Sequence, residues 1–158
     1  MEVCFDLIIP EVLTNEGSLL SEELIGWGDE QFSQDPPKYK GIGSVTFTRR
    51  PIPEHITRYL PKDLDVSDWI YLSLEQEALG AWEDAINRGD GVMAEVPLKQ
   101  FLSQLLKKLD NWAIVFELNC DQIDEVYRLS SSGLLRKIEE TLNWNNDPEG
   151  FIAWYKSN

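Results

Sequence analysis

A series of short apolar segments, several joined by connections too brief for a parallel crossover, limits the folds open to this chain. The clearest is residues 2–10, where one face is strongly apolar and Pro10 ends the run. That face carries Val3, Phe5, Leu7 and Ile9. Further strands are predicted at residues 44–50, 68–74, 92–96, 112–118, 125–130 and 150–156.

Amphipathic segments with helical spacing lie between these strands. Ser73 and Gln76 form a capping-box pattern before a helix over residues 75–88, and Gly89 supplies its end. Pro97 opens a second helix that continues to Leu109, and residues 131–142 form a third. A shorter helix is predicted from residue 18 to Gly26–Gly28, followed by a loop over residues 29–43, and residues 52–61 form a helical turn or two.

Together these elements predict one α+β domain over residues 1–158, with a mostly antiparallel sheet and about three helices packed against it. The alternative is a three-layer α/β arrangement. At 158 residues the chain can bury a substantial core without a stabilising metal or a set of disulfides. Sequence alone leaves the strand order and the oligomeric state open.

The charge is strongly negative, because 28 Asp and Glu face 14 Lys and Arg, for a net charge of -14. Nucleic acid and anionic membranes are disfavoured as partners, since both are bound through basic residues. The acids are also segregated: residues 1–37 contain nine and no Lys or Arg, and residues 110–127 add five without compensation. A basic protein is the partner that this distribution favours.

Two cysteines, Cys4 and Cys120, do not make the disulfide framework of a small secreted domain, and both fall at predicted strands where buried free thiols are common. Whether they lie close together is left open. With no basic leader and no apolar run of membrane-spanning length, a cytoplasmic location is expected.

Common catalytic and cofactor motifs are missing from the chain. The sole histidine, His55, has no HExxH partner and is expected to be a surface or helix-cap residue. Residues 41–46 read GIGSVT, which lacks the third glycine and the following helix of a phosphate-binding loop. No metal site and no cofactor are therefore expected.

Carboxylates are the remaining catalytic material. If residues 2–10 and 112–118 are neighbouring strands, then Glu2, Asp6 and Glu117 share a face of the sheet. Such a trio could coordinate Mg²⁺ or act as general acid and base, which defines an alternative hypothesis of a carboxylate-based or metal-assisted enzyme. The plainer interpretation places the three on a solvated or helix-rimmed face.

Partner contacts are expected where acids surround an aromatic residue or cluster without bases. Trp27 is flanked by glycines and acids, so it could serve as an aromatic anchor, although a tryptophan is more often a core residue. Turn and cap roles also explain Asp121 and Asp124. The candidate partner-binding residues are Glu22, Glu23, Trp27, Asp29, Glu30, Asp121, Asp124 and Glu125.

In size, acidity and lack of catalytic motifs, the chain resembles as a class the immunity proteins that bacteria keep against their own nuclease toxins. The resemblance implies an inhibitor that covers a basic, nucleic-acid-binding cleft with carboxylates and an aromatic side chain. A third hypothesis is an accessory or self-associating protein, which predicts an extensive apolar patch.

Overall fold

The computed structural model describes residues 2–33, 46–75, 78–88 and 96–157. The predicted strand at 92–96, apart from Val96, and the Gly41–Gly43 segment lie outside these ranges. The described strands are β1 (Val3–Pro10), β2 (Thr46–Arg50), β3 (Trp69–Glu75), β4 (Asn111–Leu118), β5 (Glu125–Arg128) and β6 (Phe151–Lys156). The described helices are α1 (Leu20–Ser33), α2 (Glu54–Thr57), α3 (Leu79–Arg88), α4 (Pro97–Lys107) and α5 (Ser131–Leu142).

The six strands form one sheet in the order β2-β3-β1-β4-β6-β5. Every pairing is antiparallel except that of β5 with β6, which are joined through α5. The N-terminal strand β1 lies inside the sheet between β3 and β4, so both of its edges are paired. This arrangement confirms the α+β prediction, and the three-layer α/β alternative is wrong because the sheet is not predominantly parallel.

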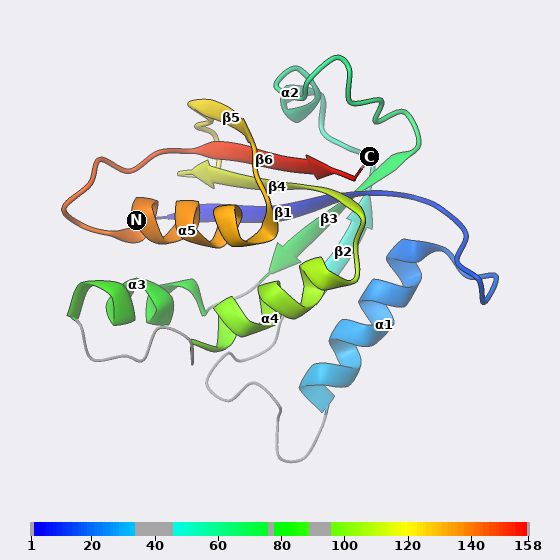
Figure 1. Ribbon diagram of the computed structural model, residues 1–158, viewed down its shortest axis with the longest axis horizontal. Helices are drawn as coiled ribbons and strands as arrows, with labels where there is room; N and C mark the ends of the chain where they lie inside the picture. The colour runs from blue at the N-terminus through cyan, green and yellow to red at the C-terminus, as the bar shows by residue number, and fades with distance from the viewer. Residues whose placement is uncertain (1, 34–45, 76–77, 89–95, 158) are drawn as a thin grey trace.

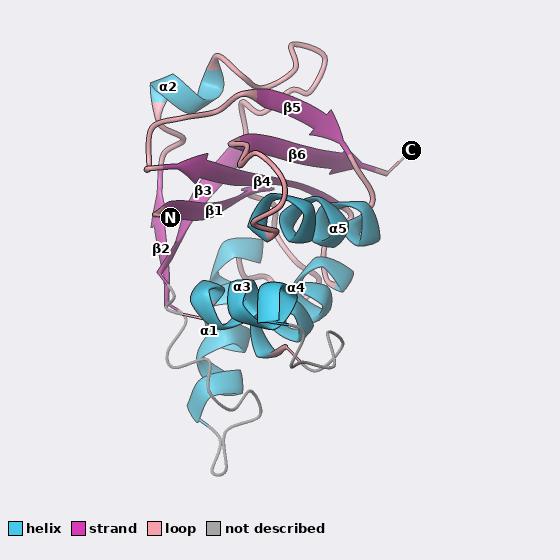
Figure 2. Ribbon diagram, turned by 90° about the vertical axis from the view of Figure 1, so that its left-hand side faces the viewer, coloured by secondary structure: helices cyan, strands magenta, loops and turns pink. Residues whose placement is uncertain are grey.

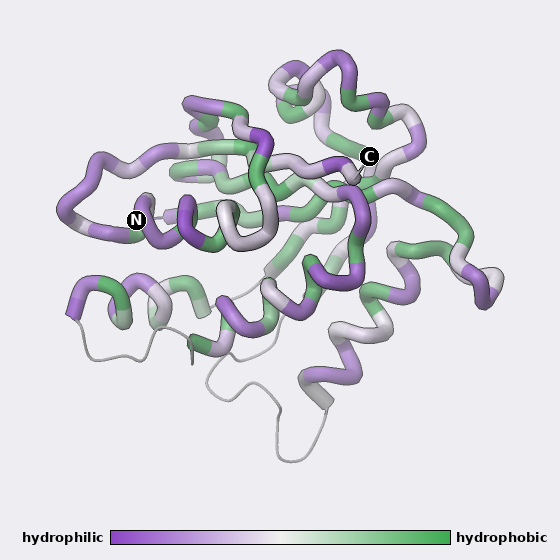
Figure 3. Tube along the Cα trace, in the orientation of Figure 1, coloured by the Kyte–Doolittle hydropathy of each residue, from purple (hydrophilic) through white to green (hydrophobic). Residues whose placement is uncertain are grey.

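Helices α1, α3, α4 and α5 cover one face of the sheet, while α2 lies on the other (Figures 1 and 2). The larger core forms under the four helices, where Trp82, Phe101 and Phe116 are fully buried. A smaller core lies on the opposite face, between the sheet and residues 52–69. Hydrophobic and hydrophilic stretches succeed one another along each helix, as expected for a helix with one apolar side (Figure 3).

The period-2 pattern of β1 divides its side chains between the two cores. Phe5, Leu7 and Ile9 face the four helices, and Ile8 packs into the smaller core. Cys4 and Asp6 share the face of Ile8 because alternate residues point the same way along a strand. The predicted alternation of residues 2–10 is thus confirmed.

Two local predictions are wrong. Helix α1 continues through both glycines to Ser33, so residues 29–33 are helical, where a loop was expected. A Cβ on Gly28 would lie 3.0 Å from Phe47 Cε2, which shows that this glycine permits close packing of α1 on β2 and does not end the helix. Ser73 is a residue of β3, not a helix cap, and its hydroxyl donates to Asp6 at 3.2 Å.

Five helices are described, where about three were expected to pack on the sheet. The additional ones are the full-length α1 and the single turn of α2. Within the described ranges, no helix has the length and apolar character needed to cross a bilayer.

Candidate functional site

Helix α1 is the most acidic element that the structure describes around an aromatic residue. Glu22 and Glu23 lie in its first turn, Asp29 and Glu30 follow near its other end, and the last turn carries no basic residue. Within the described residues, no ion pair joins Glu22, Glu23 or Asp29 to a cation. The charges of these three acids are therefore not cancelled by an ion pair inside the described fold.

A surface hollow of ≈ 360 Å³ lies beside α1. Glu16, Glu23 and Glu30 line it, seven residues apart, and Trp27 lies between the last two. Residues spaced by three, four and seven share one side of a helix, so α1 itself brings Glu23, Trp27 and Glu30 together. We call this feature the Trp27 hollow.

Trp27 lies partly in the core and partly in the hollow. Its ring stacks on Phe101 of α4 with the centroids 5.3 Å apart and the planes 16° apart. Lys108, the residue that ends α4, places its Nζ 5.0 Å from the centroid of the Trp27 ring. The half-buried indole is thus both a packing residue and an accessible aromatic surface that already holds a cation.

The acids at residues 121–125 do not join this surface. They follow β4, beside the first residues of β1, whereas α1 follows the last residues of β1. The eight residues of β1 span roughly 26 Å, and Figures 1 and 2 place β5 and α1 at opposite ends of the molecule. Asp121, Asp124 and Glu125 therefore do not share one surface with the acids of α1.

Asp124 has a structural role. Its carboxylate accepts from the backbone N–H of Gly150 at 2.9 Å and from the side-chain amide of Gln122 at 2.9 and 3.0 Å. These bonds fasten the turn after β4 to the residue before β6. Asp124 therefore bonds a residue distant in the chain and not its own local backbone, which differs from the turn role expected for it. Asp121, Asp124 and Glu125 are all exposed.

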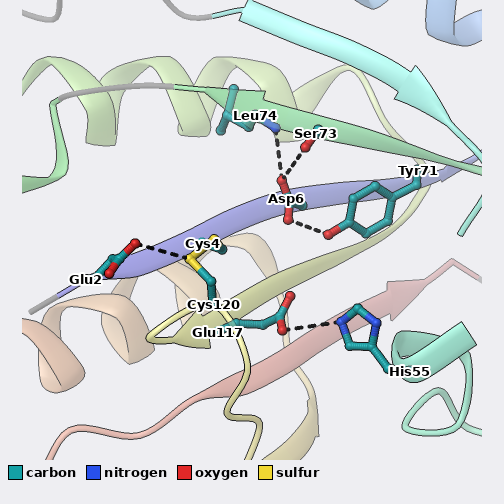
Figure 4. Close-up of a disulfide and its surroundings, with 9 residues drawn as sticks. All are labelled: Glu2, Cys4, Asp6, His55, Tyr71, Ser73, Leu74, Glu117 and Cys120. Atoms are coloured by element: carbon teal, nitrogen blue, oxygen red, sulfur yellow. Dashed lines mark hydrogen bonds and ion pairs between the residues drawn. A yellow bond between two sulfur atoms is a disulfide. The ribbon is translucent and has the colours of Figure 1, made fainter. Parts of the chain in front are cut away.

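Asp6 and Glu117 lie on the same face of neighbouring strands, as the enzyme hypothesis required (Figure 4). Cys4 is directly opposite Glu117 in the register, and Asp6 is two residues farther along β1. Glu2 does not join them: it is exposed, with Oε1 3.9 Å from Cys120 Sγ. The predicted trio is thus a pair of buried carboxylates with a third acid outside.

Asp6 is buried with donors on both oxygens. Oδ1 accepts from the Ser73 hydroxyl and, at 3.0 Å, from the backbone N–H of Leu74, while Oδ2 accepts from the Tyr71 hydroxyl. Burial, and next the bond to Asp6, raise the pKa of the Tyr71 phenol far above its usual value. This network holds β1 to β3 and leaves Asp6 little capacity to bind a further group.

Glu117 is also buried, but its hydrogen-bonding capacity is less completely satisfied than that of Asp6. Its Oε2 has no hydrogen bond, and His55 of α2 lies beside it, with Nε2 at 3.5 Å from Oε2. Burial raises the pKa of the Glu117 carboxyl; Asp6 and Asp121 raise it further, and His55 opposes the shift. His55 is exposed on the single turn of α2, so its expected surface position is confirmed, with the added contact to Glu117.

The raised pKa of Glu117 predicts a pH-dependent component of stability. The folded state holds the Glu117 proton more tightly than the unfolded state, so this stabilisation is full below about pH 4.5 and is lost as pH rises through the folded pKa. Glu117→Gln removes the titration. We expect its Tm relative to wild type to rise between pH 4 and pH 8, by about 2–4 °C for each 1 kcal/mol.

Glu125→Gln is the matched control, because it removes the same charge from an exposed residue at the start of β5 and leaves Asp6 and Glu117 unchanged. Thermal unfolding of the three proteins across this pH range measures the effect. Parallel profiles of Tm against pH for Glu117→Gln and wild type would show that the pKa of Glu117 is the same in the folded and unfolded states.

The two cysteines form a disulfide between β1 and the turn after β4, with their Cα atoms 4.8 Å apart. The prediction of buried free thiols is wrong. Cys120 belongs to the turn and not to the strand, and the antiparallel pairing of β1 with β4 brings that turn back to Cys4. Because Cys4 and Cys120 are not free thiols, they no longer support the expected cytoplasmic location.

Among the described residues, no group of three or more His, Cys, Asp or Glu has the geometry to hold a metal ion.

Glu16 and Lys108 belong to the Trp27 hollow but were not among the predicted contacts. Glu16 precedes α1, so helical spacing does not relate it to Glu23 and Glu30, and nothing local indicates Lys108 either. Searches against protein-family models, curated proteins and solved structures found no match.

Proposed function

We propose that this protein is an acidic protein-binding module that captures a basic partner through α1 and the Trp27 hollow. The observation that carries the proposal is the half-buried Trp27 in a hollow whose lining includes three glutamates. An aromatic anchor beside a predominantly acidic surface combines desolvated contact area with electrostatic complementarity to a basic partner.

Helix stability does not account for the whole acid pattern. Glu22 and Glu23 lie near the N-terminus, where the helix dipole favours negative charge. Asp29 and Glu30 lie in the C-terminal half, where the dipole disfavours it by roughly 0.3–1 kcal/mol for a charge near the end. A binding role gives these two acids a purpose that the isolated helix does not.

The more specific form of the proposal is an immunity protein that covers the nucleic-acid-binding cleft of a nuclease toxin. It is supported by the net charge of -14 and by an acidic surface that is complementary to the basic charge of such a cleft. This form expects a cytoplasmic inhibitor, a location that the Cys4–Cys120 disulfide does not favour. The inhibitor then competes with nucleic acid for the cleft of the toxin, and adding it to a cleavage assay leaves the DNA or RNA intact.

Neutralising α1 is expected to abolish capture. The variant Glu22→Gln/Glu23→Gln/Asp29→Asn removes three charges that no ion pair in the described structure uses. We expect affinity for the basic partner to fall roughly tenfold or more, mainly through slower association at low salt. Capture from an extract of the source organism, followed by binding kinetics with the recovered protein at two salt concentrations, measures this.

The control variant Asp121→Asn/Glu125→Gln/Asp147→Asn loses the same charge from exposed sites away from α1. It should retain the partner. Equal loss of binding by both variants would indicate a nonspecific effect of net charge, and loss by the control alone would move the interface to the turn after β4. Either result contradicts the proposal.

A further inference from the structure

The Trp27 hollow already contains one cation from the protein itself. Lys108 Nζ lies 5.0 Å from the Trp27 ring centroid, within the range of a cation–π contact. Three of the residues that line the same hollow are carboxylates, Glu16, Glu23 and Glu30. The chemistry at this position therefore suits an ammonium or guanidinium group.

Lys108 does not form an ion pair with a described carboxylate. It differs in this from Lys137, which also lies over an aromatic ring, that of Tyr127, but is paired with Glu149 at 3.2 Å. Lys108 is exposed and extends from the end of α4. An exposed, flexible lysine held chiefly by an aromatic face can be displaced at small cost.

We propose that the Trp27 hollow binds a lysine or arginine side chain of the basic partner, and that Lys108 occupies this position in the free protein. The inference rests on the proposed function and specifies the contact at its centre. Arginine fits best, because a planar guanidinium can stack on the indole while donating to several carboxylates at once. Lys108 then acts as an internal competitor that lowers affinity and discourages weakly basic proteins.

Removing the competitor should strengthen binding. Lys108→Met keeps a long apolar side chain and deletes the ammonium, and we expect the affinity for a hexa-arginine peptide at the hollow to rise about fivefold. Lys107→Met is the matched control: it removes the same charge one residue earlier, from an exposed residue that does not line the hollow. Its effect should stay below about twofold, since it changes only the general field.

The readout must be specific to the site, because a protein of net charge -14 attracts hexa-arginine over much of its surface. The indole N–H resonances of the six tryptophans provide this in ¹⁵N NMR spectra. Trp27→Phe assigns the Trp27 signal and keeps an aromatic ring against Phe101. We expect the Trp27 resonance to shift on titration, with the fivefold gain in Lys108→Met.

The outcomes separate this inference from the proposed function. A Trp27 shift with equal affinities in Lys108→Met and Lys107→Met leaves α1 as the binding surface but overturns the displacement of Lys108. The absence of any α1 shift, with binding confined to other acids such as Asp121 and Glu125, overturns both. A Trp27 shift with a higher affinity for hexa-arginine in Lys108→Met, but not in Lys107→Met, supports the inference and the proposed function.

Discussion

Replacing both cysteines is expected to remove a large part of the folding stability. The disulfide links Cys4 to Cys120 across a sequence separation of 116 residues. In the chain-entropy description, closing a loop of about 100 residues stabilises the folded state by about 4.7 kcal/mol, and measured values are commonly about 2–4 kcal/mol. We expect Cys4→Ala/Cys120→Ala to lose about 3–4 kcal/mol in urea unfolding, with a steeper dependence on urea because the unfolded chain expands.

The backbone at the disulfide allows a sharper comparison. Asn119 and Cys120 both have positive φ, at 54° and 61°. Asparagine tolerates this conformation, but other side chains lose roughly 1–2 kcal/mol there, and glycine does not. In the chain without Cys4, Cys120→Gly should therefore be about 1 kcal/mol more stable than Cys120→Ala.

Two results would contradict this account. Equal free energies of unfolding and equal urea dependence in wild type and Cys4→Ala/Cys120→Ala would mean that the bridge contributes nothing. Equal stability of the Gly and Ala variants at residue 120 would mean that the turn relaxes once the bridge is gone. Alkylation of the unreduced wild-type protein, read by mass, provides the control that the bridge is formed.

The strands were predictable from the sequence because their signal is local. Alternation at residues 2–10 and 112–118 placed Asp6 and Glu117 on a common face on the condition that the two strands are neighbours, and the structure pairs them. The helix at Pro97–Lys107 was predictable for the same reason, because its apolar side chains recur every three or four residues. A repeating pattern identifies the buried face of a strand or helix without reference to distant residues.

The errors depend on contacts between residues far apart in the chain. Gly28 looked like a helix end because its packing against Phe47 is not visible locally. Cys120 looked like a strand thiol because only the return of the turn after β4 brings it to Cys4. These are tertiary contacts, and no local period encodes them.

The candidate site was predicted in part for the same reason. Charge counting found the acids of α1, but it also grouped them with Asp121 and Glu125, since a count along the chain does not show that β1 separates the two sets. Lys108 was missed because α4 reaches Trp27 only in the folded state. In the folded protein, the spacing of Glu23, Trp27 and Glu30 along α1 places them on a shared surface, which a count of acids does not reveal.

Gly150→Ala is expected to be the most disruptive of the single substitutions considered. A Cβ at residue 150 would lie 1.9 Å from the backbone oxygen of Gln122 and 2.8 Å from its carbonyl carbon. Backbone atoms on both sides make this clash hard to relieve, because Gly150 O also accepts from Asp124 N–H at 2.7 Å. We expect a loss of roughly 3 kcal/mol or more in urea unfolding, with faster amide exchange across β5.

Gly80→Ala is the matched control, because a Cβ at this exposed helical position meets no atom within 4 Å. It should leave stability unchanged or raise it by up to about 1 kcal/mol. Asp124→Ala tests the same junction from the other side, since it removes the acceptor of Gly150 N–H, and should lose about 1–3 kcal/mol. If Gly150→Ala were as stable as Gly80→Ala, the turn after β4 would be free to move away from β6, and Asp124 would regain its place among the candidate partner contacts.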